Sequence, residues 1–373
     1  MPSSHLRKIA SHYLLTPQGF YSNPLITVDA VSGEILHLER YDSNLDATSL
    51  VEFYPGIICP GFVNAHCHSE LSYLKGAIAE GCGHGGFAAS MAKVRDNFTP
   101  EQRTKALLDA DSKMWNEGIN AVADIVNDNS SFVIKAQSQI EYHSFAEVFG
   151  LKTSNIEQCK SLTINPNTTL TPHSVYSVQS NDFAEVCRHS SAPLSIHFKE
   201  SEAEELLFEG KGSLAEWYSA VGFECDFLHF GSPARRIVES ISADRSVILV
   251  HNCFVTQEDI DLIMSHFSAP VHWVLCPRSN RFISGVVPDV VHLLRRNHLN
   301  ICIGTDSLAS NHSLSVLEEL KCFENIPLEE LLRWATFGGA QALGIKPRGV
   351  INIVGVDLEN MRLTPQTVVK RLV

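Results

Sequence analysis

The strongest constraint on this chain is a regular alternation, over most of its length, of short apolar runs with longer amphipathic stretches. The apolar runs contain few polar residues, as expected for β-strands buried on both faces of a parallel sheet. Eight strands are expected, at residues 61–68, 119–126, 142–149, 168–173, 194–198, 246–251, 272–276 and 300–305. Amphipathic segments such as 101–117 and 314–319 lie between them. Eight strands that alternate with helices predict an α/β fold closed into a (β/α)8 TIM-type barrel.

The two ends of the chain have a different pattern. Residues 1–60 contain short alternating runs broken by Pro, Gly and Asn, which is typical of a meander of antiparallel strands. The tail from Gly349 returns to this pattern after a helix expected over 328–343. We therefore expect a small β-sandwich domain built from residues 1–60 and 345–373, with the barrel over 61–344 inserted between them.

The composition argues against several classes of protein. The 29 basic and 42 acidic side chains give a net charge of −13, so a surface that binds nucleic acid is not expected. No apolar run reaches the roughly 20 residues that cross a bilayer. The N-terminus also lacks the apolar stretch of a signal peptide, so we expect a cytoplasmic protein without a membrane partner. Ten scattered cysteines without a Cys-x-x-Cys pair predict free thiols. The oligomeric state stays open, and a homodimer is compatible with the sequence.

A His-x-His pair, His66 and His68, ends the first expected strand. With 17 histidines in 373 residues, about one such pair is expected by chance, so the pair alone is a weak signal. Alternate residues of a strand point to the same face, so both side chains are expected inside the barrel, at its C-terminal mouth. Barrels of this type carry their active sites at that mouth.

Other strand ends carry residues of the same kind. His173 ends the fourth strand, His197 and Glu200 lie at the end of the fifth, His251 ends the sixth and Asp306 follows the eighth. Each has an ordinary alternative, because a lone histidine is usually just hydrogen-bonded and Asp306 alone is more often a helix N-cap. Five of eight strand ends with such residues nevertheless predict one shared site.

Neutral imidazoles and one carboxylate suit a borderline divalent ion, with Zn²⁺ as the first choice and Fe²⁺ as the second. The expected ligands are His66, His68, His197 and Asp306. The ion would lower the pKa of a bound water, so that hydroxide is available near neutral pH. Glu200 is expected to take the proton of this water and return it to the substrate. His251 would orient or stabilise the attacking hydroxide, and Asp306 would also serve in catalysis.

The ordered set His-x-His, Thr-Pro-His, His-x-x-Glu, His and Gly-Thr-Asp-Ser resembles the amidohydrolase superfamily. It is most similar to the branch of cytosine, guanine, adenosine-type and triazine deaminases and chlorohydrolases, which includes aminofutalosine deaminases. The similarity runs from Pro60 to Gly344, and the stretches 276–280 and 310–311 add supporting matches. The resemblance implies the same metal ligands, Glu200 as proton shuttle, His251 beside the attacking water, and His173 as a substrate-binding residue.

The resemblance also bears on the number of metal ions. Members that hold two ions carry a lysine at the end of the fourth strand, where this chain has Thr171-Pro172-His173. One ion is therefore expected.

Four further features lie near the expected site, and the first three have two interpretations each. Glu70 and Ser72 follow the histidine pair into the first loop, where they could contact a heterocycle; a surface carboxylate is the alternative for Glu70. The guanidinium of Arg278 could donate hydrogen bonds to a carboxylate or a purine oxygen, or the side chain could point outward. Residues 81–86 match Gly-x-Gly-x-x-Gly but follow no buried strand, so we interpret them as a lid segment near the mouth, with His84 as a solvent-exposed histidine or a substrate contact. The run of glutamates after Glu200 is interpreted as a solvated helix face.

The sequence thus predicts a deaminase that acts on a purine base or an adenine-type nucleoside. Hydroxide attack on a ring carbon that bears an amino group would release ammonia. Hydrolysis of a cyclic amide or imidazolone, and dechlorination, are alternatives at the same site. A barrel that has lost its chemistry is a further alternative, although the expected ligands and Glu200 are all present.

Overall fold

The computed structural model describes residues 5–42, 50–189, 192–285 and 290–373. The first four residues and residues 43–49 of the predicted N-terminal domain lie outside the described residues, as do 190–191 and 286–289. All eight strands expected in the middle of the chain are present. They are β6 (Phe62–Cys67), β7 (Ile119–Val126), β8 (Glu141–Val148), β9 (Thr168–Pro172), β10 (Leu194–Phe198), β11 (Val247–His251), β12 (Val271–Leu275) and β13 (Asn300–Ile303).

These strands form two four-stranded parallel sheets, in the orders β6-β7-β8-β9 and β10-β11-β12-β13. The two sheets contact each other along both pairs of edge strands. One bridge joins Ser174 to His197, where the His197 amide donates to the carbonyl of His173 at 2.9 Å. A second bridge joins Cys67 to Asp306. The predicted α/β fold with parallel strands is therefore confirmed.

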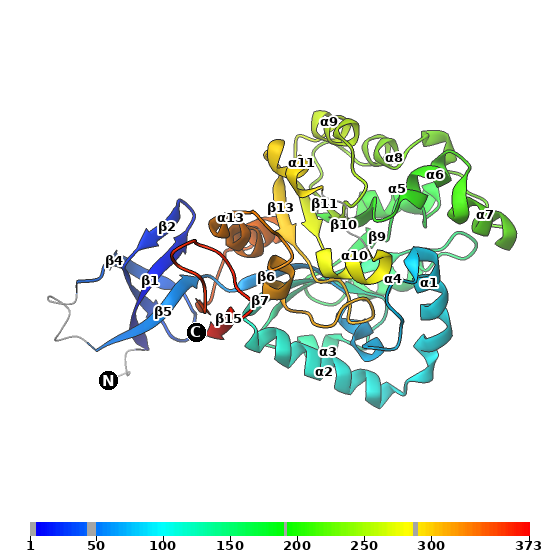
Figure 1. Ribbon diagram of the computed structural model, residues 1–373. Helices are drawn as coiled ribbons and strands as arrows, with labels where there is room; N and C mark the ends of the chain where they lie inside the picture. Colours follow the sequence, from blue (N-terminus) through cyan, green and yellow to red (C-terminus); the bar gives the residue numbers. More distant parts are fainter. Residues whose placement is uncertain (1–4, 43–49, 190–191, 286–289) are drawn as a thin grey trace.

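Helices cover the outside of the parallel sheets (Figure 1). They are α1 (Gly83–Val94), α2 (Pro100–Asn116), α3 (Phe132–Lys135), α4 (Ile156–Leu162), α5 (Ser180–His189), α6 (Glu202–Phe208), α7 (Gly212–Val221), α8 (Pro233–Ser240), α9 (Gln257–His266), α10 (Pro277–Ser284), α11 (Val291–Arg296), α12 (Val316–Leu320), α13 (Leu328–Arg333) and α14 (Gly339–Leu343). Short 3₁₀ turns η1 (Ser69–Leu74), η2 (Arg95–Asn97) and η3 (Leu228–Phe230) and a π-helical turn η4 (Trp334–Gly338) complete them. The helix expected over 328–343 is α13, η4 and α14 in succession.

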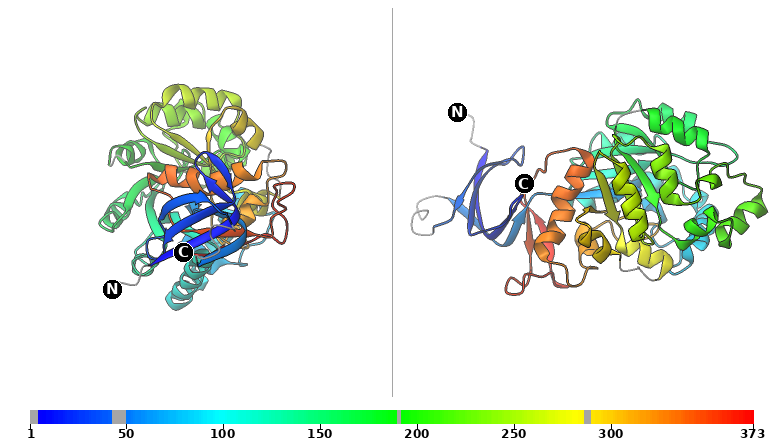
Figure 2. Two further views of the ribbon diagram at one scale, coloured as in Figure 1. Left: turned by 90° about the vertical axis from the view of Figure 1, so that its left-hand side faces the viewer. Right: turned by 90° about the horizontal axis from the view of Figure 1, so that it is seen from above.

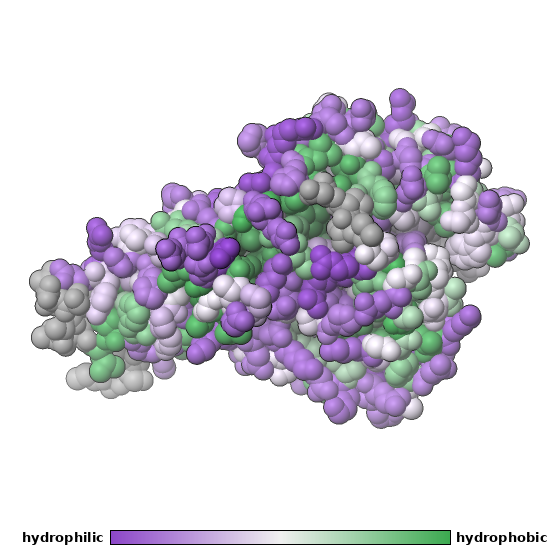
Figure 3. Space-filling model, in the orientation of Figure 1, coloured by the Kyte–Doolittle hydropathy of each residue, from purple (hydrophilic) through white to green (hydrophobic). Residues whose placement is uncertain are grey.

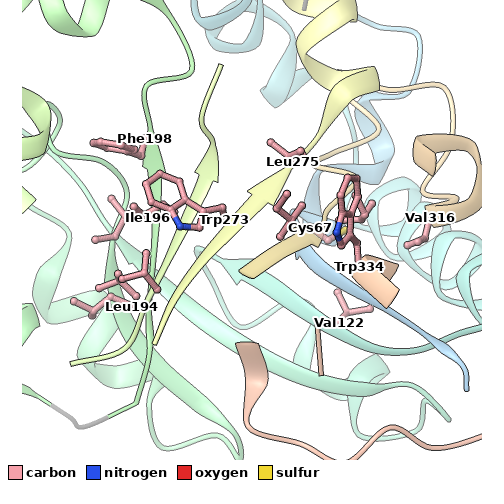
Figure 4. Close-up of a cluster of buried hydrophobic side chains, with 14 of the residues drawn as sticks. Cys67, Val122, Leu194, Ile196, Phe198, Trp273, Leu275, Val316 and Trp334 are labelled. Atoms are coloured by element: carbon pink, nitrogen blue, oxygen red, sulfur yellow. The ribbon is translucent and has the colours of Figure 1, made fainter. Parts of the chain in front are cut away.

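The strands are buried on both faces, as their apolar sequences predict. Leu194, Ile196 and Phe198 alternate along β10 and pack outward, in the cluster that includes Trp273 and Trp334 (Figure 4). Residues of both sheets meet in a second, inner cluster. Its strand members are Val63, Ala65, Ala121, Ala123, Ile125, Phe145, Ile248, Val250, Val274 and Cys302. The inner faces of the two sheets therefore pack against each other.

The two ends of the chain join in one seven-stranded mixed sheet. Its strands are β1 (Leu6–Thr16), β2 (Gly19–Ser22), β3 (Pro24–Asp29), β4 (Ile35–Arg40), β5 (Val51–Cys59), β14 (Ile351–Val354) and β15 (Val368–Arg371). Their order is β15-β14-β5-β1-β3-β4, with β2 paired to β1. Most neighbours are antiparallel, as predicted, but β1 and β5 are parallel, so the strands do not form a simple meander. This sheet lies at one end of the molecule, beside the parallel sheets and their helices (Figures 1 and 2).

The surface agrees with this arrangement. The outward faces of α2 and α9 are largely hydrophilic in the view of Figure 3. Among the described residues, no helix combines the length and the apolar character needed to span a membrane. All ten cysteines lie within the described ranges and are free, as predicted.

Candidate metal centre

Strand β6 carries the first two histidines, and a β-bulge aims them. Between Asn64 and Cys67 the strand advances three residues while β7 advances two, so one extra residue lies on β6. Ala65 packs in the inner cluster and Cys67 in the outer one. Because the bulge shifts the alternation by one residue, His66 and His68 both face the interior.

The histidines and Asp306 form one compact cluster. The ring of His66 lies 4.9 Å from that of His68 and 4.8 Å from that of His197, measured between centroids. Nε2 of His68 is 3.3 Å from Nε2 of His197. Oδ1 of Asp306 lies 4.0 Å from Nε2 of His66 and 3.7 Å from Nε2 of His68. His251 lies beside them, its ring 5.8 Å from that of His66. The structure thus brings the predicted ligands together.

The protonation states of the cluster suit metal ligands. Burial, reinforced by His68, keeps the pKa of His66 well below the usual histidine value. Burial also lowers the pKa of His197, with His173 as the next cause. Burial alone would raise the pKa of Asp306, but the surrounding histidines hold it at about 2. Neutral imidazoles and an ionised carboxylate are the forms that bind a divalent ion.

Neighbouring groups orient the donor atoms. Nδ1 of His197 lies 2.9 Å from the carbonyl of His173, so its proton is on Nδ1 and the lone pair of Nε2 faces the cluster. The hydroxyls of Ser279 and Ser310 donate to Oδ2 of Asp306 at 2.6 and 2.8 Å. These bonds leave Oδ1 of Asp306 turned toward the histidines. Such outer contacts fix ligand geometry in metal sites.

Unpaired atoms show that the donors fit an ion. Neither ring nitrogen of His66 has a hydrogen-bond partner among the described residues, although its side chain is fully buried. Buried polar atoms are normally paired. A divalent ion among Nε2 of His66, Nε2 of His68, Nε2 of His197 and Oδ1 of Asp306 would give Nε2 of His66 the partner that it lacks. Three imidazoles and one carboxylate are a donor set that zinc accepts.

Glu200 lies in the turn between β10 and α6, and a buried carboxylate holds this turn. Glu204 accepts from the backbone amides of Lys199 at 2.8 Å, Glu200 at 2.7 Å and Ser201 at 3.1 Å. Burial raises the pKa of Glu204 to about 8. The interpretation of the glutamate run as a solvated face is therefore wrong for Glu204, which caps α6 and faces inward. An i,i+3 capping pattern from Ser201 to Glu204 is the sequence signal for this role.

His251 stands between the cluster and Glu200. Its Nε2 lies 3.7 Å from Oε2 of Glu200, and the side-chain amide of Asn280 donates to its Nδ1 at 3.1 Å. This bond places the His251 proton on Nε2, which faces Glu200 and the cluster. The backbones of His251, Asn252 and Asp306 have φ values of 78°, 59° and 57°, in the left-handed region that residues other than glycine rarely adopt. Strain of this kind gathers at functional sites.

His173 begins a wall of rings beside the cluster. It stacks on His197 with centroids 4.6 Å apart, and its Nδ1 is 2.8 Å from the hydroxyl of Ser177. Tyr176 meets it edge-on at 6.1 Å, and Phe149 at 6.4 Å. A flat heterocycle suits such a wall.

The remaining predicted substrate contacts lie in hydrogen-bonded positions. Glu70 accepts from the amide of Asn127 and the hydroxyl of Ser131, both at 2.9 Å. The Ser72 hydroxyl donates to the carbonyl of Ser69 at 2.7 Å. Nε of Arg278 donates to Asn311 at 3.1 Å, and its guanidinium lies near Glu318 and Glu319. Substrate contacts of Glu70, Ser72 and Arg278 stay predictions.

Three residues of the site gave little signal in the sequence. Oε1 of Glu147, on β8, is buried 3.7 Å from Nδ1 of His197. Tyr176 follows β9 without any motif of its own. His84 lies in the segment interpreted as a lid and reaches Glu200, at 3.6 Å. All three face the cluster because of how distant segments pack.

Comparison with known proteins shows the family to which the chain belongs. A sequence model described as the amidohydrolase family matches residues 57–353. The chain belongs to the amidohydrolase family. The resemblance predicted from the motifs is therefore confirmed, and this amidohydrolase belongs among enzymes that act on carbon–nitrogen bonds other than peptide bonds.

Three relatives of this amidohydrolase illustrate the likeness. An adenosine deaminase of Helicobacter pylori is 28% identical over 79% of the chain and 76% of that protein. The structure of Helicobacter pylori aminofutalosine deaminase in complex with methylthio-coformycin has a TM-score of 0.78 and 25% identity, covering 93% of this chain and 92% of that one. A Xanthomonas campestris adenosine deaminase solved with bound zinc has a TM-score of 0.72 and 20% identity, covering 95% and 86%.

Proposed function

We propose that this amidohydrolase is a deaminase of aminated heterocycles that uses a single divalent ion, zinc first and iron second. The observation that carries the proposal is the compact cluster of His66, His68, His197 and Asp306, with Glu200 and His251 at its side. One ion is proposed because the fourth strand ends in Thr171-Pro172-His173, without the lysine of two-metal relatives.

The chemistry divides between the ion and the residues around it. A bound divalent ion supplies a water whose pKa is lowered to about 7. Glu200 would take one proton from the attacking water and deliver it to the ring nitrogen next to the carbon under attack. The Nε2–H of His251 faces the oxygen that adds to this carbon and stabilises its developing charge.

Loss of the amino group completes the reaction. The tetrahedral carbon carries both the new hydroxyl and the amino group. Glu200 moves the hydroxyl proton to the amino nitrogen, ammonia leaves, and a ring carbonyl forms. One water is consumed and one ammonia released, so a single carboxylate accounts for both proton transfers.

The ring wall and the relatives support a purine or an adenine-type nucleoside as substrate. His173, Tyr176 and Phe149 present ring edges and faces beside the cluster. The relatives named above are adenosine and aminofutalosine deaminases. Adenosine-type and aminofutalosine-type nucleosides and guanine are therefore the first substrates to test.

Ammonia release from a panel of substrates tests the function. The panel holds adenosine, a thioether nucleoside, aminofutalosine, guanine, cytosine and an aminotriazine, with a cyclic amide and a chlorotriazine as controls. We expect ammonia from at least one purine, none from the Glu200→Gln variant, and the same metal content in both proteins. Turnover confined to the cyclic amide or to chloride release would contradict a deaminase, and an active Glu200→Gln would remove Glu200 from the proton transfer.

We further propose that the two parallel sheets close into one (β/α)8 barrel over residues 61–344. The two bridges between the sheets and the shared inner cluster support this closure. The sheet from both chain ends would then form a second domain over 1–60 and 345–373. A sandwich-like fold of that sheet is supported by its own apolar cluster, which includes Ile9, Ile26 and Ile58.

A further inference from the structure

Helix α1 lies beside α10 at the edge of the site (Figure 1). One of its residues reaches inward. No residue of α1 is fully buried. Its second residue, His84, is nevertheless only 27% exposed in its side chain and points to the site. Nδ1 of His84 lies 3.6 Å from Oε2 of Glu200. Its Nε2 lies 3.2 Å from the hydroxyl of Tyr176.

The chain before α1 fixes where this histidine can lie. The amide of Gly81 donates to the carbonyl of Phe282, in α10, at 2.7 Å. Glu80 contacts His312 at 3.1 Å, and the His312 ring packs edge-on against Phe282. Helix α10 also carries Asn280, the partner of His251. Helix α10 therefore contacts both the segment that carries His84 and the side chain of His251, the two histidines that face Glu200.

The surroundings also define the tautomer of His84. The Tyr176 hydroxyl can donate or accept, whereas Oε2 of the Glu200 carboxylate can only accept. The tautomer that suits both neighbours therefore has Nε2 of His84 accepting a hydrogen bond from Tyr176. The ring proton then lies on Nδ1, which has no hydrogen-bond partner among the described residues and faces Oε2 of Glu200. Contacts in catalytic sites are often long before substrate binds and tighten in the complex.

We propose that His84 is a positioning residue for proton transfer: its Nδ1–H holds the Glu200 carboxylate from the α1 side, alongside His251. The proposal rests on the proposed role of Glu200 in the reaction. Nε2 of His251 lies 3.7 Å from the same oxygen, Oε2, that His84 approaches. Two donors on different elements restrict the rotation of Glu200 between the attacking water and the ring nitrogen. The α1 segment thereby completes the site rather than only covering it.

Kinetics of three variants test this role. His84→Ala removes both contacts, and we expect kcat to fall about tenfold or more, the effect of losing one hydrogen bond to a charged group, with KM changed much less. His84→Asn keeps an N–H near the position of Nδ1 and should recover most of kcat. Tyr176→Phe should show a smaller loss. Lys93→Gln, an exposed change on the same helix, is the control and should leave kcat and KM unchanged.

Hydrogen exchange gives a readout that needs no turnover. If His84 holds Glu200, the Glu200→Ala variant should release the first turn of α1, and the amides of residues 84–87 should exchange faster than in the wild type. Exchange in α5 serves as the internal control. Unchanged exchange at 84–87 would overturn the proposal, as would equal kcat values for His84→Ala and the wild type, or equal losses for His84→Ala and His84→Asn. Failure of every panel substrate would count against the deaminase alone, because the exchange result still decides the role of His84.

Discussion

Burial of a histidine whose ring nitrogens make no hydrogen bonds costs free energy of folding. His66, at the centre of the cluster, is buried in this way among the described residues. We predict that His66→Ala lowers metal content sharply. Loss of a group that only hydrogen-bonds to a ligand already weakens metal affinity about 10- to 100-fold, and loss of the ligand itself costs at least as much. Metal analysis of the purified variant measures this. His37→Ala, an exposed change on β4, is the control, and full metal occupancy in His66→Ala would contradict the ligand assignment.

We expect the buried carboxyl group of Glu319 to make the free energy of unfolding depend on pH. It is fully buried and accepts from the Arg278 amide at 2.9 Å and from Asn311 at 2.7 Å. Burial raises its pKa from 4.5 to about 8. Between these values the folded state keeps a proton that the unfolded state has released, so this group makes stability fall as pH rises.

The variant Glu319→Gln does not titrate and should escape this loss. Its free energy of unfolding relative to the wild type should therefore increase from pH 4.5 to above pH 8. Urea unfolding at both ends of this range measures the difference, with the exposed Glu324→Gln as the control. A difference that stays constant with pH would show that Glu319 is ionised throughout.

At the scale of elements, the strand ends depend on turns that backbone bonds alone do not hold. The β10–α6 turn carries Glu200 and is fixed by the carboxylate of Glu204, which accepts three amides. The bulge in β6 likewise decides where His66 and His68 point. Each of these features positions only a few residues at the mouth.

We predict that Glu204→Ala lowers both stability and kcat. Each buried amide left unpaired costs roughly 1–3 kcal/mol, and the backbone of Glu200 loses its support. Urea unfolding and steady-state kinetics measure the two effects. Glu202→Ala removes an exposed glutamate from the same turn of α6 and should change neither. Unchanged kcat in Glu204→Ala would show that the turn holds its shape without this carboxylate.

At the scale of the whole molecule, Arg371 joins the C-terminal strand to the parallel sheets. Its guanidinium donates to the carbonyls of Trp115 and Ile119 and to the side chain of Asn120, at 2.8, 3.0 and 2.9 Å. It also lies over the Trp115 ring, 3.4 Å from the centroid. One side chain thus links β15 to the segment that begins β7.

We predict that Arg371→Met destabilises the protein by about 2 kcal/mol, the size of a hydrogen bond to a charged group, and leaves the metal centre intact. Calorimetry should show a lower Tm, with wild-type metal content. Lys370→Met, an exposed change on the same strand, is the control. An unchanged Tm would mean that pairing between β14 and β5 alone holds the chain ends together.

The sequence by itself determined the eight strands, the metal-ligand candidates and Glu200. The apolar runs and the residues at strand ends are local properties of the sequence, and the folded structure keeps them because most residues of these strands are buried. The tertiary structure alone decided the bulge that aims His66 and His68 and the contact of His84 with Glu200. Both features depend on which distant segments pack together. A histidine in an amphipathic stretch has the same local sequence pattern whether its side chain faces solvent or a carboxylate.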